Sequence, residues 1–148
     1  MVDKLISYWE SQKIRLTVGV NKDTIKNFEQ TKGINLPKEF FEYLQVVNGM
    51  ELMYPNYTDT NGFLFYPLEN LIFFEDEFCN FQDNLNPGLL GKKCLIFANY
   101  LQRSWWYGIT ADNSIVIIPN ASEYKIVANS FFEFLELYIN DLDTIYDY

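Results

Sequence analysis

The chain has 148 residues, of which 49% are hydrophobic and 18% aromatic, and its 20 acidic and 11 basic side chains give a net charge of −9. This length and composition predict one folded domain over residues 1–148 rather than a disordered chain. Histidine is absent, which excludes Ser-His-Asp catalysis, Cys-His catalysis and histidine-based zinc sites.

The cysteine count and the lack of long apolar segments bear on the compartment. Cys79 and Cys94 are too few for a disulfide framework or a four-cysteine zinc site, and we expect reduced, partly buried thiols. Residues 1–10 lack the basic-then-apolar order of a signal peptide. No apolar run approaches the roughly 18 residues that a membrane helix needs. We therefore expect a soluble, cytoplasmic protein with no membrane association.

Two helices are predicted at the start of the chain. Residues 3–13 carry apolar side chains at helical spacing. Residues 21–32 form the second predicted helix, in which Asn21 or Asp23 can cap the first turn and Gly33 can end the last.

The third predicted helix, residues 37–47, has a signal at each end. Pro37 fits the first helical position, where its missing N–H needs no partner. Asn48 and Gly49 readily adopt a positive φ and therefore predict a helix stop. The apolar stripe between these signals consists of Phe40, Phe41, Leu44 and Val47.

After this helix the pattern changes to turns and short strands. Residues 51–61 lack periodicity and contain several turn-forming residues, so an exposed loop is expected. Residues 63–66 predict a short strand that Pro67 closes. Residues 68–74 suit a helical turn or an irregular connection, and residues 80–88 form an Asn-rich loop.

The second half of the chain predicts a sheet and a closing helix. Residues 93–98, 104–109 and 114–118 read as strands joined by short turns, and residues 124–127 as a last strand. The sheet should be mostly antiparallel because its connections are short.

A final helix is predicted from Asn129 or Ser130, either of which can cap it, through Leu142. Residues 143–148 form an acidic, aromatic tail. Helices first, strands next and one helix last predict a single α+β domain, with N-terminal helices packed on a mostly antiparallel sheet.

Charge is distributed unevenly along the chain. Residues 39–91 contain nine acidic residues and no Lys or Arg, whereas residues 1–38 carry a net charge of +3. Nucleic-acid binding is not expected, because phosphate contacts rely on basic side chains. Such a stretch would attract a basic partner; the alternative is an acidic surface that only keeps the protein in solution.

Candidate partner-binding residues combine aromatic rings with charges, a mixture that suits a basic and partly apolar partner. Strand alternation places Trp105 and Tyr107 on one face and Trp106 on the other. We expect one tryptophan to be buried and the other exposed as an anchor; the alternative is that helices cover both faces. The candidate set is Tyr54, Tyr57, Asp59, Glu75, Asp76, Glu77, Arg103, Trp105 and Trp106.

Catalytic and metal chemistry find little support in the sequence. Residues 75–77 (Glu-Asp-Glu) could attract Mg²⁺ or Ca²⁺, but the pattern of a calcium loop is missing and a solvated acidic turn is favoured. Glu133 and Glu136 could form a glycosidase acid–base pair, but a polar helix face is favoured. We predict no catalytic residue, no metal site and no cofactor.

The order of these elements resembles the SUKH superfamily (Smi/Knr-like), which includes fungal regulators of cell-wall glucan synthesis and many bacterial toxin-immunity proteins. The resemblance rests on Leu36-Pro37, Phe40-Phe41, Leu44, Asn48-Gly49, the strand 63–66, the run 94–118 and the ending 129–135. One departure is the segment 99–103 (Asn-Tyr-Leu-Gln-Arg), where many members carry a Gly/Asp-rich turn.

The resemblance implies a non-enzymatic protein-binding domain. The first expectation is an immunity protein that neutralises a bacterial polymorphic or contact-dependent toxin by binding it directly. The alternative is a scaffold or regulator of cell-wall glucan synthesis or signalling. The implied partner is a basic toxin domain encoded nearby, and the protein itself is expected to be a monomer or a weak dimer.

Overall fold

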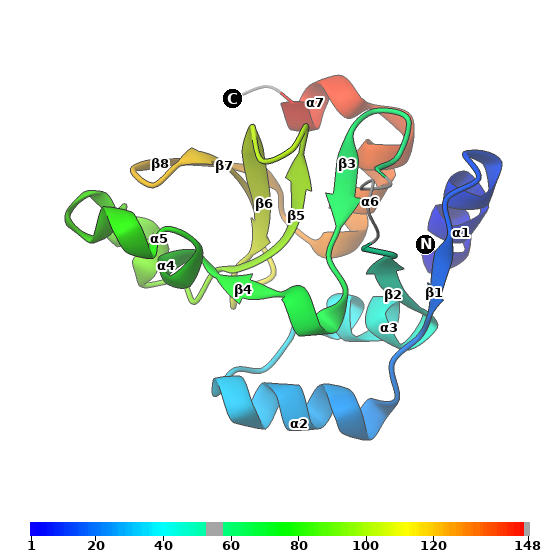
Figure 1. Cartoon of the computed structure of the whole chain (residues 1–148), viewed down its shortest axis with the longest axis horizontal. Helices are drawn as coiled ribbons and strands as arrows, with labels where there is room; N and C mark the ends of the chain where they lie inside the picture. Colours follow the sequence, from blue (N-terminus) through cyan, green and yellow to red (C-terminus); the bar gives the residue numbers. More distant parts are fainter. Residues whose placement is uncertain (53–57, 147–148) are drawn as a thin grey trace.

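The computed structural model describes residues 1–52 and 58–146 (Figure 1). The helices are α1 (Val2–Ser11), α2 (Lys22–Lys32), α3 (Lys38–Val46), α4 (Phe74–Glu77), α5 (Pro87–Leu90), α6 (Phe131–Asn140) and α7 (Leu142–Tyr146), with 3₁₀ turns at Leu68–Asn70 and Cys79–Asn84. The strands are β1 (Leu16–Val18), β2 (Val47–Met50), β3 (Phe63–Phe65), β4 (Ile72–Phe73), β5 (Leu95–Tyr100), β6 (Trp105–Ile109), β7 (Ile115–Asn120) and β8 (Glu123–Ala128).

The strands form one large and one small sheet. The large sheet has the order β3-β5-β6-β7-β8, with β4 also paired to β5, and all of its pairings are antiparallel. Strands β1 and β2 form a separate antiparallel pair. The predicted α+β class, with an antiparallel sheet and a closing helix, is confirmed.

The ends of two helices follow the predicted capping chemistry. Asn21 Oδ1 accepts the Asp23 N–H at 2.7 Å, and Gly33 ends α2 with φ +68°. Ser130 Oγ accepts the Glu133 N–H at 3.1 Å, and the Glu133 carboxylate accepts the backbone N–H of residue 129 at 2.6 Å. The pair resembles a capping box, except that the carboxylate accepts the N–H of the residue before the N-cap, and it gives Glu133 a structural task at the start of α6.

The third helix ends within one residue of the predicted position, but the predicted helix stop at residues 48–49 is wrong. Helix α3 stops at Val46, and Asn48 and Gly49 lie within β2 instead of forming a helix stop. Gly49 does have a positive φ of +67°, but the reason is a close backbone approach: a Cβ there would lie 2.5 Å from the Tyr66 carbonyl oxygen. Asn48 Oδ1 accepts the Leu68 N–H at 2.7 Å, which ties β2 to the segment after β3.

Three other segments differ from prediction. Most of the tail expected from residue 143 belongs to helix α7. Ile145 of this helix is buried, and its backbone carbonyl accepts a hydrogen bond from the Tyr107 hydroxyl at 2.7 Å. The Asn-rich loop contains a 3₁₀ turn and α5. The strand predicted over residues 114–118 continues as β7 to Asn120. In each case a tertiary contact or a strand pairing overrides the local turn signal.

Helices α1, α3 and α6 lie on one face of the large sheet (Figure 1). This interface consists largely of rings. Phe97 of β5 lies 5.4 Å from Phe134 of α6 and 5.8 Å from Phe40 of α3, centroid to centroid. Burial of each such ring stabilises the fold by about 1.5–3 kcal/mol. The core between sheet and helices is therefore the principal source of stability.

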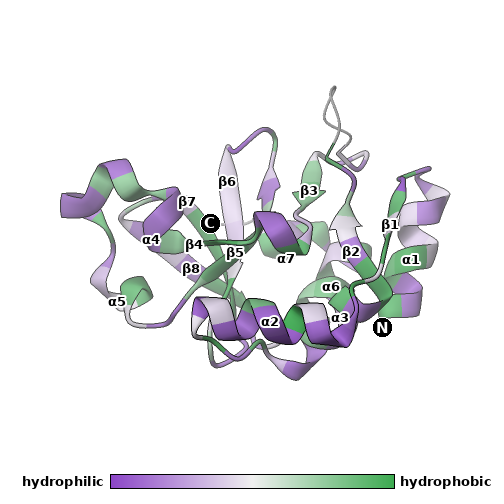
Figure 2. Ribbon diagram, turned by 60° about the horizontal axis from the view of Figure 1, so that its bottom comes forward, coloured by the Kyte–Doolittle hydropathy of each residue, from purple (hydrophilic) through white to green (hydrophobic). Residues whose placement is uncertain are grey.

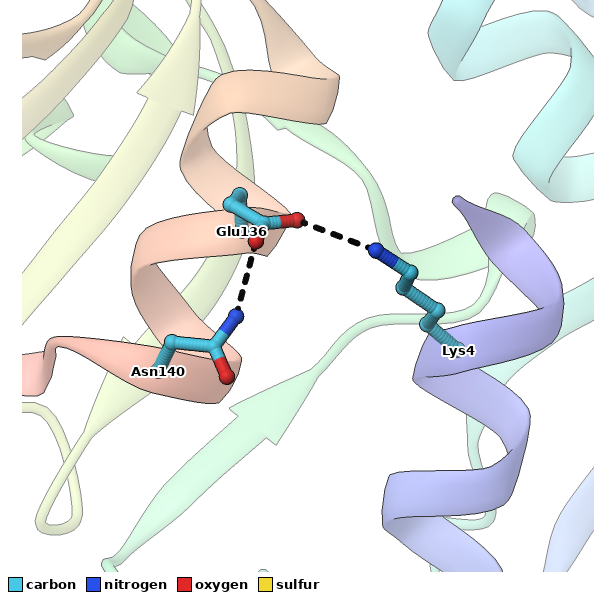
Figure 3. Close-up of polar contacts among 3 residues, drawn as sticks. All are labelled: Lys4, Glu136 and Asn140. Carbon is cyan, nitrogen blue, oxygen red and sulfur yellow. Dashed lines mark hydrogen bonds and ion pairs between the residues drawn. The ribbon is translucent and has the colours of Figure 1, made fainter.

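Helix α1 is held against α6 by buried contacts to Tyr138 and by one contact at the surface. Trp9 is fully buried, its indole N–H donates to the Tyr138 hydroxyl of α6 at 2.9 Å, and its ring also lies 5.1 Å from that of Phe65 on β3. At the surface, Lys4 Nζ lies 3.8 Å from Glu136 Oε2, and Asn140 Nδ2 donates to Glu136 Oε1 at 2.9 Å (Figure 3). An exposed ion pair contributes about 0–1 kcal/mol, so Trp9 supplies most of the attachment.

The opposite face of the sheet is covered only in part. Phe74 and Phe78 at α4 and Leu89 of α5 are buried against one end of it. Helix α2 lies at the margin of the domain, and Figure 2 shows hydrophilic residues along it. Ile25 is the one residue of this helix that is buried. None of the helices formed by residues 1–52 and 58–146 is long and apolar enough to cross a membrane.

Candidate functional site

A cleft of about 580 Å³, here called the polar cleft, occupies the partly covered face of the sheet. Its floor is formed by Leu64 of β3, by Tyr66 and by Asn99 of β5. Its walls are formed by the segment around α4, by the turn after β5, and by residues 52 and 58. The charged or polar wall residues are Thr58, Asn70, Glu77, Gln102 and Arg103.

A hydrogen-bonded pair fixes the polar part of the floor. Asn99 Nδ2 donates to the Tyr66 hydroxyl at 2.9 Å, and Asn99 Oδ1 accepts the Arg103 N–H at 3.3 Å. The turn between these residues is unusual, because Leu101, Gln102 and Arg103 all have positive φ. Asn99 therefore both orients the tyrosine and supports the turn that carries Arg103.

Two opposite charges face the Tyr66 hydroxyl. Burial raises the pKa of Tyr66, and the hydrogen bond from Asn99 opposes that rise. Glu77 adds to the rise and Arg103 counteracts it, as expected for charges of opposite sign near one phenol. Among the described residues Glu77 and Arg103 form no ion pair. The cleft thus offers one carboxylate and one guanidinium to a bound group.

A second depression, the apolar hollow, adjoins α4. It has a volume of about 410 Å³ and is lined mainly by Phe78, Phe81, Trp106 and Pro119. Phe78 and Trp106 meet edge to face at 4.9 Å, and Phe81 remains 53% exposed. Asn99 of the cleft pairs with Trp106 of the hollow on neighbouring strands, and Glu77 of the cleft precedes Phe78 of the hollow, so the two depressions lie side by side.

The predicted alternation along β6 is confirmed, and it separates the two tryptophans. Trp105 lies on the helical face, where its Nε1 donates to the Tyr107 hydroxyl at 3.0 Å and its ring stacks on Tyr100 at 4.5 Å. Trp106 lies on the other face, in the hollow. Both are half-buried, so the expectation of one buried and one exposed tryptophan is wrong. The structure assigns only Trp106 to the candidate surface.

The acidic triplet lies on α4 rather than in a solvated turn. Glu77 lines the polar cleft, Asp76 is exposed, and Glu75 is half-buried. One Glu75 carboxylate oxygen is buried and has no hydrogen-bond partner among the described residues. Helical geometry therefore divides three consecutive acids among three environments, and Glu77 is the member that faces the cleft.

The loop candidates have different outcomes. Tyr54 and Tyr57 lie outside the described residues. The exposure expected for Asp59 is wrong: its side chain is 3% exposed and buried inside the domain. Its carboxylate accepts the backbone N–H groups of Asn61 at 2.8 Å and Phe63 at 2.9 Å, and also the Tyr138 hydroxyl. Asp59 is a structural residue because these buried donors need it.

Other reactive groups lie apart from the cleft. Both cysteines are free thiols; Cys79 is exposed, contrary to the expected partial burial, and burial raises the pKa of Cys94. Within the described ranges, no three Asp, Glu, His or Cys side chains gather closely enough to hold a metal ion. Glu133 and Glu136 are exposed and occupied by the cap and the ion pair already described.

Sequence reasoning placed Glu77, Arg103 and Trp106 among the candidates, and these three border the cleft or the hollow. It missed Tyr66, Asn99 and the ring pair Phe78 and Phe81. The register between β3 and β5 brings Leu64 opposite Asn99, and no local pattern reveals that pairing. Phe81 could have been noticed as an aromatic residue within an otherwise polar run.

The family model described as the SMI1 / KNR4 family (SUKH-1) matches residues 19–137. The matched range contains all the residues that line the polar cleft and the apolar hollow. No curated protein matches the sequence significantly.

Proposed function

The chain belongs to the SMI1/KNR4 family (SUKH-1), and from this premise we propose that it is an immunity protein. It would bind a bacterial toxin directly and occlude it, without catalysing a reaction. Domains of this family generally bind protein partners, and the match over residues 19–137 is the observation that carries the proposal.

The charge distribution supports a basic partner. Residues 39–91 contain no Lys or Arg, and this stretch supplies Glu77 to the polar cleft as well as the exposed acids Glu69 and Asp76 in the helical turns on either side of β4. A negative surface of this kind accelerates association with a positive one, whereas desolvated rings determine how long a complex lasts. Phe81 and Trp106 are the rings available on this face.

The chemistry of the cleft supports recognition more than turnover. Its titratable groups are a tyrosine whose pKa is raised, one carboxylate and one guanidinium. A general base requires a group whose pKa lies near the working pH and within reach of a proton. The raised pKa of Tyr66 moves it away from that range, whereas its hydrogen bond to Asn99 makes it a fixed contact surface.

The test is co-expression with the product of the adjacent gene, in wild-type and catalytically inactive forms. We expect the chain to restore growth in the presence of the active protein and to co-purify with the inactive one, with slower association at high salt. The proposal would be overturned if the chain restored no growth and formed no complex even at low salt. A complex with a cell-wall synthesis protein, without rescue, would point to the scaffold role instead.

A further inference from the structure

We propose that the polar cleft and the apolar hollow together hold one extended segment of the partner protein. The segment carries a Lys or Arg side chain that pairs with Glu77 and, close to it in sequence, an apolar side chain that enters the hollow between Phe78, Phe81 and Trp106. This inference deepens the proposed protein-binding function and specifies the part of the partner that is recognised.

The arrangement of the two depressions favours an extended chain. Glu77 and Phe78 are consecutive, so their Cα atoms are about 3.8 Å apart. In an extended peptide, side chains two residues apart lie on the same face at roughly 6.8 Å. A basic residue and an apolar residue at such spacing can therefore reach the carboxylate and the rings at the same time. A single compact ligand would leave one of the depressions empty.

Exposed apolar side chains gather at these depressions. Leu52 and Leu101 line the polar cleft and Phe81 lines the hollow, and all three are exposed despite their size. Exposed apolar groups that cluster around a concave surface mark an interaction site more often than scattered ones do. The partner segment would cover them and displace water from the rings.

Charge selects the occupant. The cleft presents Glu77, and Asp76 and Glu69 lie exposed on the same acidic stretch of the chain. Arg103 is the one basic side chain among the described residues that line the cleft. A cationic side chain therefore suits the α4 wall, while Arg103 suits a carbonyl or carboxylate oxygen of the same segment. An acidic segment would meet repulsion from Glu77 and from the exposed Asp76 beside it in the chain.

The experiment begins with a random peptide library displayed on phage and selected on the wild-type protein. We expect the selected peptides to combine Lys or Arg with a nearby apolar residue. Glu77→Gln and Phe81→Ser should each weaken their binding by about tenfold or more. The matched controls are Glu10→Gln on α1 and Val18→Ser, at a valine that is 90% exposed; both should bind as wild type does. Circular dichroism verifies that each variant is folded.

Indole N–H resonances in ¹⁵N-labelled protein locate the peptide. Trp9 and Trp105 donate to tyrosine hydroxyls on the helical side of the sheet, whereas the buried Trp106 indole N–H lies on the other face, near the Tyr66 hydroxyl, and opposes the rise in the pKa of that tyrosine. The peptide should shift the Trp106 resonance and leave the other two unchanged. The inference would be overturned if no peptides were selected, if Glu77→Gln and Phe81→Ser both bound the peptides as wild type does, or if only the Trp105 resonance shifted.

The same variants separate this inference from the proposed function. If both variants bind and neutralise the toxin as wild type does, the immunity role stands and the cleft is not its site. If selected peptides bind the cleft as described but no neighbouring gene product is bound or neutralised, the site stands and the immunity role fails.

Discussion

Replacement of Asp59 by alanine removes the centre of a buried polar network. Its carboxylate accepts two backbone N–H groups, from Asn61 and Phe63, and the hydroxyl of Tyr138. Tyr138 in turn accepts the Trp9 indole N–H at 2.9 Å. The network therefore joins helix α1, the turn before β3 and helix α6, which are distant in sequence.

The cost follows from the donors that lose their acceptor. The N–H of Phe63 and the hydroxyl of Tyr138 are buried, and each unsatisfied buried donor costs about 1–3 kcal/mol. The N–H of Asn61 is less buried and can bind water at little cost. We therefore expect Asp59→Ala to lower the free energy of unfolding by about 3–5 kcal/mol. That is a large share of the roughly 5–15 kcal/mol that typical domains possess.

Urea unfolding followed by circular dichroism measures this change. The matched control is Asp83→Ala, which removes an exposed aspartate and should shift the free energy by no more than about 0.5 kcal/mol. Tyr138→Phe leaves the Trp9 N–H without an acceptor and should cost about 1–3 kcal/mol. A loss below about 1 kcal/mol for Asp59→Ala would refute the argument that these donors depend on the carboxylate.

The pH dependence of the Asp59 contribution has a defined sign. Burial raises the pKa of Asp59, although its hydrogen bonds oppose the rise. The contribution is therefore complete below the pKa of the unfolded chain, about 3.9, and declines as the pH rises through the higher pKa of the folded state. Asp59→Asn does not titrate, so the stability advantage of wild type over this variant should shrink as the pH rises above about 4. An advantage that grows over this range would contradict the sign.

Three further predictions concern packing and ionisation. Gly49→Ala should destabilise the protein by about 1 kcal/mol or more beyond Gly33→Ala, because both have nearly the same positive φ but only Gly49 has backbone atoms where the new methyl group would lie; equal costs in urea unfolding would contradict this. A thiol reagent should modify Cys79 rapidly and Cys94 only after denaturation, since Cys94 is buried with a raised pKa; two fast thiols in the native state would be the contrary result. Burial raises the pKa of Tyr43 and other tyrosines, so the stability that these residues contribute is complete below about pH 10, the pKa of the unfolded chain, and declines as the pH rises further. Absorbance of tyrosinate should therefore rise together with the loss of near-ultraviolet circular dichroism, and a gradual rise in a folded protein would argue against it.

Local chemistry made part of the fold predictable. The caps of α2 and α6 depend on residues within one helical turn, so Asn21 and Ser130 could be identified without tertiary information. The strand alternation at Trp105 and Trp106 is equally local. The prediction of a helix stop at Asn48 and Gly49 was wrong because a positive φ occurs in two settings, at the end of a helix and where two backbone segments approach closely. Only the position of Tyr66 distinguishes them.

The site was less predictable because it depends on contacts between distant segments. Tyr66 and Asn99 are 33 residues apart and meet through the register of β3 and β5. Whether Trp106 is covered depends on the irregular segment after α4, which has no periodicity from which its path could be inferred. Asp59 looked like a loop acid, because nothing in its neighbourhood shows that Tyr138 needs an acceptor. Charge patterning still identified Glu77, since that signal does not require the fold.

The two faces of the sheet differ in how much the fold depends on their side chains, and the proposed function places recognition on the partly covered face. On the helical face, Tyr107 bonds to α7 and Phe97 packs against α3 and α6, so most substitutions there disturb the core. On the other face, Phe81 and Arg103 are exposed, and no described residue depends on their side chains for a hydrogen bond. Substitutions at these two positions can therefore change the surface offered to a partner at little cost in folding energy. A domain built in this way can keep its core while the residues on its partly covered face vary, as the proposed protein-binding function requires.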